Sequence, residues 1–235
     1  MTTEMTDAVS RPLVMLRGVG LEVAEPVPTR ILHPVDLDIE SATAVAVVGP
    51  SGAGKTTLAS LIGALQQPTE GSYRFDGQEV AGMSGARLAE FRARDVGFVF
   101  QHSHLIDERS VVANVDLGLV GSELHRVERA ELCAAALEWV GLATLGARRS
   151  AFLSGGERHR VAIARALVKS PRLILADEPT AALDQETGRE ILELLANATA
   201  RGATVILVTH DPRAVEYVDA VHRIVDGRLT GGGHS

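Results

Sequence analysis

Gly49-Pro-Ser-Gly-Ala-Gly54-Lys55-Thr56 follows the apolar run Ala44–Val48 and opens a stretch of helical composition. The segment has the spacing G-x-x-x-x-G-K-[ST] of a phosphate-binding loop between a strand and a helix. Its glycines let main-chain N–H groups approach phosphate oxygens without a Cβ in the way, and the helix N-terminus adds a favourable dipole. The sequence therefore predicts a nucleotide site over residues 49–57.

Two side chains of this loop have distinct expected tasks. Lys55 is expected to reach the β- and γ-phosphates, and the Thr56 hydroxyl to bind Mg²⁺. Lys55 and Lys169 are the only lysines in the chain, so one of the two occupies the position that the motif requires. The predicted nucleotide-binding residues of the loop are Gly49, Pro50, Ser51, Gly52, Ala53, Gly54, Lys55, Thr56 and Thr57.

A second polar feature ends the apolar run Leu173–Ala176, where Asp177 and Glu178 follow directly. An aspartate at the edge of a strand can hold Mg²⁺, and the next glutamate can act as general base toward an attacking water. The alternative is an acidic pair that only terminates the strand. The phosphate-binding loop in the same chain favours the catalytic interpretation.

The order of elements predicts an α/β fold with a P-loop NTPase core and a mainly parallel sheet. Apolar runs at 44–48, 173–176 and 204–208 suit strands covered on both faces, and helices are expected at 55–65, 155–169 and 185–200. Strands at 13–23, 30–39 and 71–77 suggest an N-terminal antiparallel β subdomain. Residues 105–150 read as a helical subdomain insertion, with a helix at 123–140. We expect a single domain over 1–230 and a disordered tail over 231–235.

Composition and charge argue against several classes of protein. The 235 residues carry 23 basic and 30 acidic side chains, a net charge of −7, which disfavours a general nucleic-acid binder. Residues 1–20 lack the pattern of a signal peptide, and no apolar run reaches the ~18 residues that span a membrane. The single cysteine, Cys133, excludes an internal disulfide and reads as a buried apolar residue.

Leu153-Ser154-Gly155-Gly156-Glu157 and the helical stretch after it resemble the signature motif of ATP-binding-cassette (ABC) ATPases. The resemblance covers residues 13 to 228 and keeps the family order of elements. Its further motifs are the Q-loop glutamine Gln101, the acidic pair Asp177-Glu178, the D-loop aspartate Asp184 and the switch histidine His210.

The resemblance implies ATP hydrolysis between two cassettes that close head to tail over two ATP molecules. Ser154, Gly155 and Gly156 would face the γ-phosphate that the partner subunit holds. Gln101 would bind Mg²⁺ and the water, and His210 would contact the γ-phosphate. Asp184 would couple the two sites. Glu178, His210, Lys55 and Gln101 are thus the expected catalytic residues, and Thr56, Gln101 and Asp177 the expected metal ligands.

Within the family, the segments 92–101 and 175–180 look most like the branch of lipoprotein-release, macrolide-export and cell-division ATPases. That branch implies an integral membrane permease as partner, with the ATPase held at the cytoplasmic face of the membrane. The second ATPase subunit is expected to form a homodimer with this chain, because the phosphate-binding loop and the signature are both intact; a homologous cassette is the alternative. The apolar pairs 105–106 and 111–112 are candidates for contact with the permease; the alternative is that they are core residues.

Three features depart from the family pattern. Glu157 stands where many members have glutamine, and Ala42-Thr43 replaces the usual Gly-Glu turn. The aromatic residue that stacks on adenine is missing, and its place falls at Val23. An aliphatic side chain is therefore expected to hold the base.

Other function classes stay open but explain less. A GTPase would carry Asn-Lys-x-Asp, and neither lysine follows an asparagine. A P-loop kinase would leave residues 153–157 unexplained. A soluble ABC-type ATPase acting on nucleic acid or ribosomes usually has two cassettes or long coiled coils. His102 and His104 lack a third ligand nearby and read as solvated rather than metal-binding.

Overall fold

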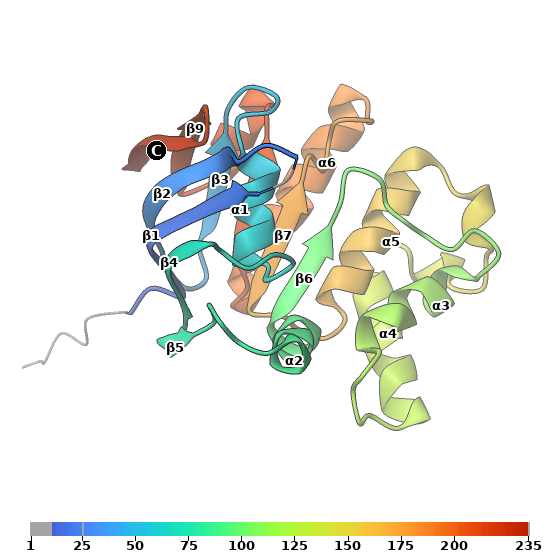
Figure 1. The fold of residues 1–235 in the computed structure, drawn as a ribbon. Coiled ribbons are helices and arrows are strands. Elements are labelled where there is room, and N and C mark those ends of the chain that lie inside the picture. Colours follow the sequence, from blue (N-terminus) through green and yellow to red (C-terminus); the bar gives the residue numbers. More distant parts are fainter. Residues whose placement is uncertain (1–10, 25, 235) are drawn as a thin grey trace, which may run out of the picture.

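The computed structural model describes residues 11–24 and 26–234 as two sheets flanked by helices (Figure 1). The larger sheet has six strands in the order β10-β9-β3-β8-β7-β6. Its pairings are parallel except that between β9 and β10, which confirms the predicted mainly parallel sheet. The strands are β3 (Ala44–Val48), β6 (Val96–Val99), β7 (Leu173–Asp177), β8 (Thr204–Thr209), β9 (Ala220–Val225) and β10 (Arg228–His234).

Strand β8 explains why the central runs are apolar throughout. All six of its residues are buried. Val205 and Leu207 pack into the core shared with the helical part, which comprises residues 105–167. Ile206 and Val208 pack into the core shared with the antiparallel sheet. Because alternate side chains point to opposite faces, a strand with a core on each side needs apolar residues at every position.

The antiparallel sheet has the order β2-β1-β4-β5. Its strands are β1 (Val14–Val23), β2 (Thr29–Ile39), β4 (Glu70–Phe75) and β5 (Gln78–Glu79). It shares a core with helix α1 (Lys55–Ile62) and lies on the side of the large sheet away from the helical part (Figure 1). The Tyr73 hydroxyl, fully buried, donates to the Ile62 carbonyl at 2.7 Å and ties β4 to the end of α1.

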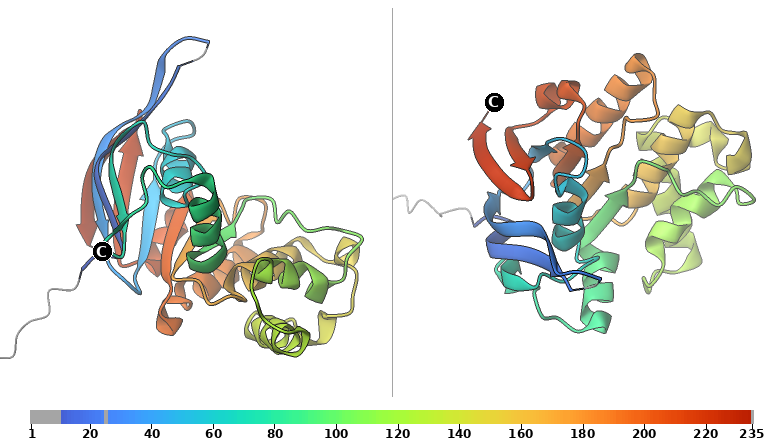
Figure 2. Two further views of the ribbon diagram at one scale, coloured as in Figure 1. Left: turned by 60° about the horizontal axis from the view of Figure 1, so that its bottom comes forward. Right: turned by 45° about the horizontal axis from the view of Figure 1, so that its top comes forward.

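The helical part projects from the side of the parallel sheet that carries β6 (Figure 2). Buried Asn114 holds its entry segment in place: its amide donates to the Ile106 carbonyl at 3.0 Å and to Ser150 Oγ at 2.9 Å, and its oxygen accepts from the Ile106 N–H. Helices α3 (Val111–Asp116), α4 (Arg126–Trp139) and α5 (Gly155–Leu167) belong to this part. The remaining α-helices are α2 (Gly85–Asp95) and α6 (Gln185–Ala196).

The structure differs from the expected boundaries in several places. Helix α1 ends at Ile62 and α6 at Ala196, each before the expected end, and α2, β6, β9 and β10 were not anticipated. The expectation of a disordered tail is wrong for 231–234, which continue β10 against β9, because an added antiparallel strand satisfies the main-chain groups at the sheet edge. Ser235 lies outside the described residues. Among the described helices, none has the length and apolar character needed to span a membrane.

Candidate functional site

The predicted catalytic residues come from segments at the carboxyl ends of four adjacent parallel strands. The phosphate-binding loop follows β3, Gln101 follows β6, Glu178 follows β7 and His210 follows β8. Because parallel strands end at the same edge of a sheet, these segments meet there. They form a cavity of about 570 Å³, lined by Ile31, Ser51, Gly52, Gly54, Lys55, Thr56, Thr57, Gln101, Glu178, Ala181 and His210.

The backbone of the phosphate-binding loop depends on glycine at specific points. Gly52 and Gly54 have φ of 76° and 99°, in the left-handed region that side chains disfavour, and Gly54 is the residue that precedes α1. A Cβ on Gly49 would overlap the carbonyl oxygen of Ile224 in β9. The motif glycines therefore shape the loop and let it pack against the neighbouring strand.

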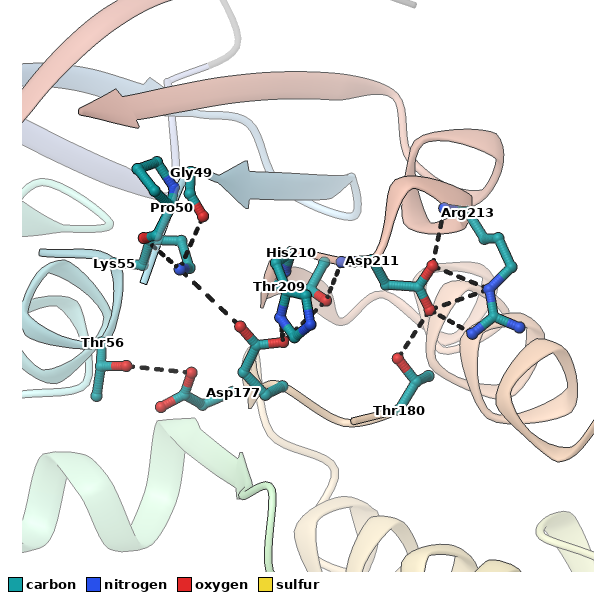
Figure 3. A network of polar contacts seen from close by, with 11 residues as sticks. Gly49, Pro50, Lys55, Thr56, Asp177, Thr180, Thr209, His210, Asp211 and Arg213 are labelled. Atoms are coloured by element: carbon teal, nitrogen blue, oxygen red, sulfur yellow. Dashed lines mark hydrogen bonds and ion pairs between the residues drawn. The ribbon is translucent and has the colours of Figure 1, made fainter. Parts of the chain in front are cut away.

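Lys55 lies within this loop and is 7% exposed. Its Nζ donates to the carbonyl oxygens of Gly49 and Pro50, each at 3.0 Å, and lies 3.9 Å from Glu178 Oε1 (Figure 3). A cation held here by main-chain oxygens is placed beside the loop amides, where the phosphates of a nucleotide would lie.

Glu178 has a φ of 48°, unusual for a residue with a side chain. Its N–H donates to the Val208 carbonyl at 2.7 Å, which fixes the backbone directly after β7 to β8. Its Oε2 accepts from Thr209 Oγ1 at 3.1 Å and lies 2.9 Å from His210 Nδ1 (Figure 3). Strain of this kind persists where the surroundings enforce it, and here they aim a carboxylate into the cavity.

Asp177 and Thr56 provide the oxygen atoms that suit Mg²⁺. The Thr56 hydroxyl donates to Asp177 Oδ1 at 3.3 Å, and burial raises the pKa of that aspartate, partly offset by the Thr56 hydrogen bond. Mg²⁺ in nucleotide sites uses one or two carboxylates together with substrate phosphates and water. Thr56 and Gln101 line the cavity, and Asp177, which is not part of the lining, contacts the Thr56 hydroxyl, so the three side chains fit this ion. Within 11–24 and 26–234 there is no cluster of three or more His, Cys, Asp or Glu suited to a metal.

The signature residues lie elsewhere. Ser154, Gly155 and Gly156 form the start of α5 and do not line the cavity. Ser154 Oγ accepts from the Glu157 N–H at 3.3 Å, and the Glu157 carboxylate accepts from the Ser154 N–H at 2.7 Å. This reciprocal capping box gives Glu157 a structural role that the sequence analysis did not assign, although the spacing Ser-x-x-Glu is the sequence signature of such a box.

Asp184 also lies outside the cavity lining, at the start of α6. Its carboxylate accepts hydrogen bonds from the N–H groups of Glu186 and Thr187 at 3.1 and 3.0 Å. The hydrogen bonds from Thr187 contribute most to lowering the pKa of Asp184. Val23 ends β1, is 42% exposed and pairs with Thr29, and it too is absent from the lining. A single chain thus brings together the residues of the loop, Gln101, Glu178 and His210 but not the signature residues, Asp184 or Val23.

Several residues of this region carried no signal in the sequence. Ile31 and Ala181 line the cavity because β2 and the loop after β7 pass beside it. Next to His210, Asp211 accepts hydrogen bonds from Arg213 and from the Thr180 hydroxyl (Figure 3). The Arg213 guanidinium lowers the pKa of Asp211 to about 2, so this anchor of the loop after β8 stays charged at neutral pH.

Comparison with known proteins supports this assignment. Residues 32–181 match the family model described as ABC transporter. The lipoprotein-releasing system ATP-binding protein LolD of Anaeromyxobacter dehalogenans is 42% identical, over 97% of each chain. The macrolide export ATP-binding/permease protein MacB 1/2 of Paracoccus denitrificans is 44% identical over 93% of this chain, which spans only 33% of that protein.

A solved structure agrees over nearly the whole chain. A dimeric ATP-binding cassette in a post-hydrolysis state bound to ADP and Pi superposes with a TM-score of 0.85 and 33% identity, covering 94% of this chain and 98% of that one. The fold and the cavity thus define a P-loop nucleotide-hydrolysing domain. The chain belongs to the ABC transporter family, and within it is an ATPase that binds and hydrolyses ATP.

Proposed function

We propose that two copies of this chain close head to tail over two ATP molecules and drive a membrane permease. The proposal rests on one observation: within a single chain, the signature residues lie apart from the cavity that holds the other expected ATP contacts. Each of these two sets of residues is called a half-site. Lys55, Gln101, Glu178 and His210 share one cavity, whereas Ser154 lies outside it at the exposed start of α5. A helix N-terminus with available N–H groups is suited to a phosphate, and a second chain would supply that phosphate.

The residues of the cavity divide the work of hydrolysis. Lys55 stabilises the charge of the β- and γ-phosphates, and the loop amides orient them. Glu178 accepts a proton from the attacking water, while His210, 2.9 Å from its Oε2, lies where it can contact the γ-phosphate. Thr56, Asp177 and Gln101 would hold Mg²⁺, which neutralises charge on the phosphate oxygens when bound.

A membrane permease is the partner that the relatives suggest. The macrolide-export relative combines ATP-binding and permease functions in its name, and this chain aligns with about a third of it, 33% of its length. The lipoprotein-releasing relative is an ATP-binding protein of the same length as this chain. We infer the same arrangement here, with the ATPase peripheral at the cytoplasmic face of the membrane, and no nucleic-acid partner for a chain of net charge −7.

Glu178→Gln tests the proposal. Loss of the base should slow hydrolysis while ATP still binds, so ATP with Mg²⁺ should convert the variant from monomer to dimer in size-exclusion chromatography with light scattering. Adding Lys55→Ala to the same variant should abolish that conversion, because the phosphate contact is lost. A Glu178→Gln variant that hydrolyses ATP at the original rate, or that stays monomeric at saturating ATP, would contradict the proposal.

Purification of the chain from membranes tests whether its partner is a permease. The tagged full chain, purified from membranes in mild detergent, should retain an integral membrane protein, and that partner should stimulate its ATPase activity. Recovery with ribosomes or nucleic acid in place of a membrane protein would favour the soluble class of ABC ATPase.

A further inference from the structure

His159 lies in the second turn of α5, is 5% exposed and has no part in the chemistry described above. Its ring joins two separate segments. Nδ1 lies 3.0 Å from the carbonyl oxygen of Gly155 and Nε2 lies 3.1 Å from the carbonyl oxygen of Gln101. The first contact stays within one helical turn, whereas the second crosses 58 residues of sequence to a residue of the nucleotide cavity.

The two contacts differ in what else satisfies the acceptor. The Gly155 carbonyl is at the start of a helix and takes the main-chain N–H of His159 in the i to i−4 pattern. In the described part of the chain, no main-chain N–H outside helices and strands donates to the Gln101 carbonyl. A neutral imidazole carries one N–H and both partners are carbonyl oxygens, so only one of the two contacts can be a hydrogen bond. The N–H stabilises most on Nε2, where it donates to the Gln101 carbonyl.

The loop after Gln101 is attached to the same helix at two further points. The Arg158 guanidinium pairs with Asp107 at 2.7 Å. Arg165 donates to the carbonyl oxygens of Ser103 and His104 at 2.7 and 2.9 Å. Helix α5 thus holds residues 101–107 along their length, and His159 is the attachment at Gln101 itself.

We propose that His159 is a positioning residue that fixes Gln101 relative to the signature residue Ser154. The two residues serve different half-sites, because Gln101 lines the cavity of its own chain and Ser154 faces the nucleotide of the partner in the proposed dimer. Through α5 and the Nε2 bond, His159 sets the distance between them. This inference rests on the proposed head-to-tail dimer. It makes His159 important for dimer closure and turnover, and unimportant for the first binding of ATP to a single chain.

Two isosteric substitutions separate the ring nitrogens. The amide nitrogen of His159→Gln can reach the place of Nε2, whereas that of His159→Asn reaches only the place of Nδ1. We expect His159→Gln to keep kcat within about 2-fold of the original chain. His159→Asn should lower kcat roughly 3- to 10-fold, the effect of one hydrogen bond, and should raise by a similar factor the ATP concentration that drives Glu178→Gln to dimerise. The dissociation constant for ATP, measured on the monomer by isothermal titration, should stay the same.

Arg160→Gln is the matched control. Arg160 is the next residue on α5, and its guanidinium contacts the Val140 carbonyl and Glu190, away from residues 101–107. It should lower the thermal midpoint without changing the ATP dependence of dimerisation. Equal kcat in the Gln and Asn variants, or a loss in His159→Asn matched by an equal loss in monomer ATP affinity, would overturn the positioning role. Failure of Glu178→Gln to dimerise with His159 intact would instead overturn the proposed dimer.

Discussion

At the residue scale, the geometry of the site depends on backbone strain and on single hydrogen bonds. Glu178 holds a backbone conformation that side chains disfavour, and its N–H bond to Val208 enforces it. One residue earlier, Asp177 keeps the extended geometry of β7 and contacts Thr56. Glu178 thereby lines the cavity, whereas Asp177 contacts the Thr56 hydroxyl beside it, which suits Asp177 to a metal and Glu178 to a water.

At the residue scale, one prediction concerns the side chains that hold the adenine base. No Phe, Tyr or Trp occurs before Tyr73, and Tyr73 is fully buried. Ile31 lines the cavity and Val23 lies near the end of the neighbouring strand, so adenine would rest on aliphatic side chains. Aromatic stacking contributes about 0.5–1.5 kcal/mol beyond burial, a factor of about two to twelve in affinity. We expect ATP and GTP to be hydrolysed with similar efficiency, and Val23→Tyr to tighten ATP several-fold.

Isothermal titration of both nucleotides would check this expectation. Val27→Tyr, on the same β1–β2 hairpin and 65% exposed, is the control that should leave affinity unchanged. A strong preference of the original chain for ATP, without a gain in Val23→Tyr, would mean that another side chain holds the base.

At the scale of elements, helix α5 combines three tasks. Its first turn carries the signature residues, its buried face holds Val161, Ile163 and Ala164 in the core, and its polar face fixes residues 101–107. An element with contacts on every side has a well-defined position, so its N-terminus can present Ser154 in a fixed orientation.

The capping box of α5 gives a prediction for Glu157. Glu157→Ala removes the acceptor for the Ser154 N–H and should lower stability by about 1 kcal/mol, or the thermal midpoint by about 2–4 °C. Glu157→Gln keeps an acceptor oxygen at the same place and should stay close to the original midpoint. Differential scanning calorimetry of the three proteins checks this, and an equal decrease in both variants would refute the capping role.

For the whole molecule, the surface after Gln101 decides how a permease could be engaged. Leu105 and Val111 are buried in the core of the helical part, so they do not form a free surface. Val112 is partly buried against the same core, and Ile106 is 39% exposed. Of the two apolar pairs that were candidates for contact with the partner, Leu105 and Val111 are therefore core residues, and Ile106 is the residue suited to such a contact.

Ile106→Asp should keep basal ATPase activity and lose most of the stimulation by the permease, because a charge would enter an apolar contact. Leu105→Asp should instead destabilise the fold, since it buries a charge in the core at a cost of roughly several kcal/mol. ATPase assays of the free chain and of the isolated complex, with thermal midpoints, distinguish the two. Undiminished stimulation of Ile106→Asp would exclude this surface from the contact.

The sequence alone determined the phosphate-binding loop, the central strands and the signature helix, because each depends on residues that are consecutive or periodic. Runs apolar at every position predicted strands between two cores, and the motif glycines predicted the turn before α1. The sequence did not predict β10, because the pairing of an edge strand depends on the neighbouring strand rather than on the strand's own residues.

Only the tertiary structure decided which distant residues meet. Gln101 and Glu178 share a cavity because β6, β7, β8 and β3 lie side by side with their carboxyl ends together, an order that no local spacing encodes. The same holds for Ile31 beside the phosphate-binding loop and for the bond from His159 to Gln101. Hydrogen bonds and packing between segments follow from strand order and helix placement, which the whole chain settles jointly through the burial of its two cores.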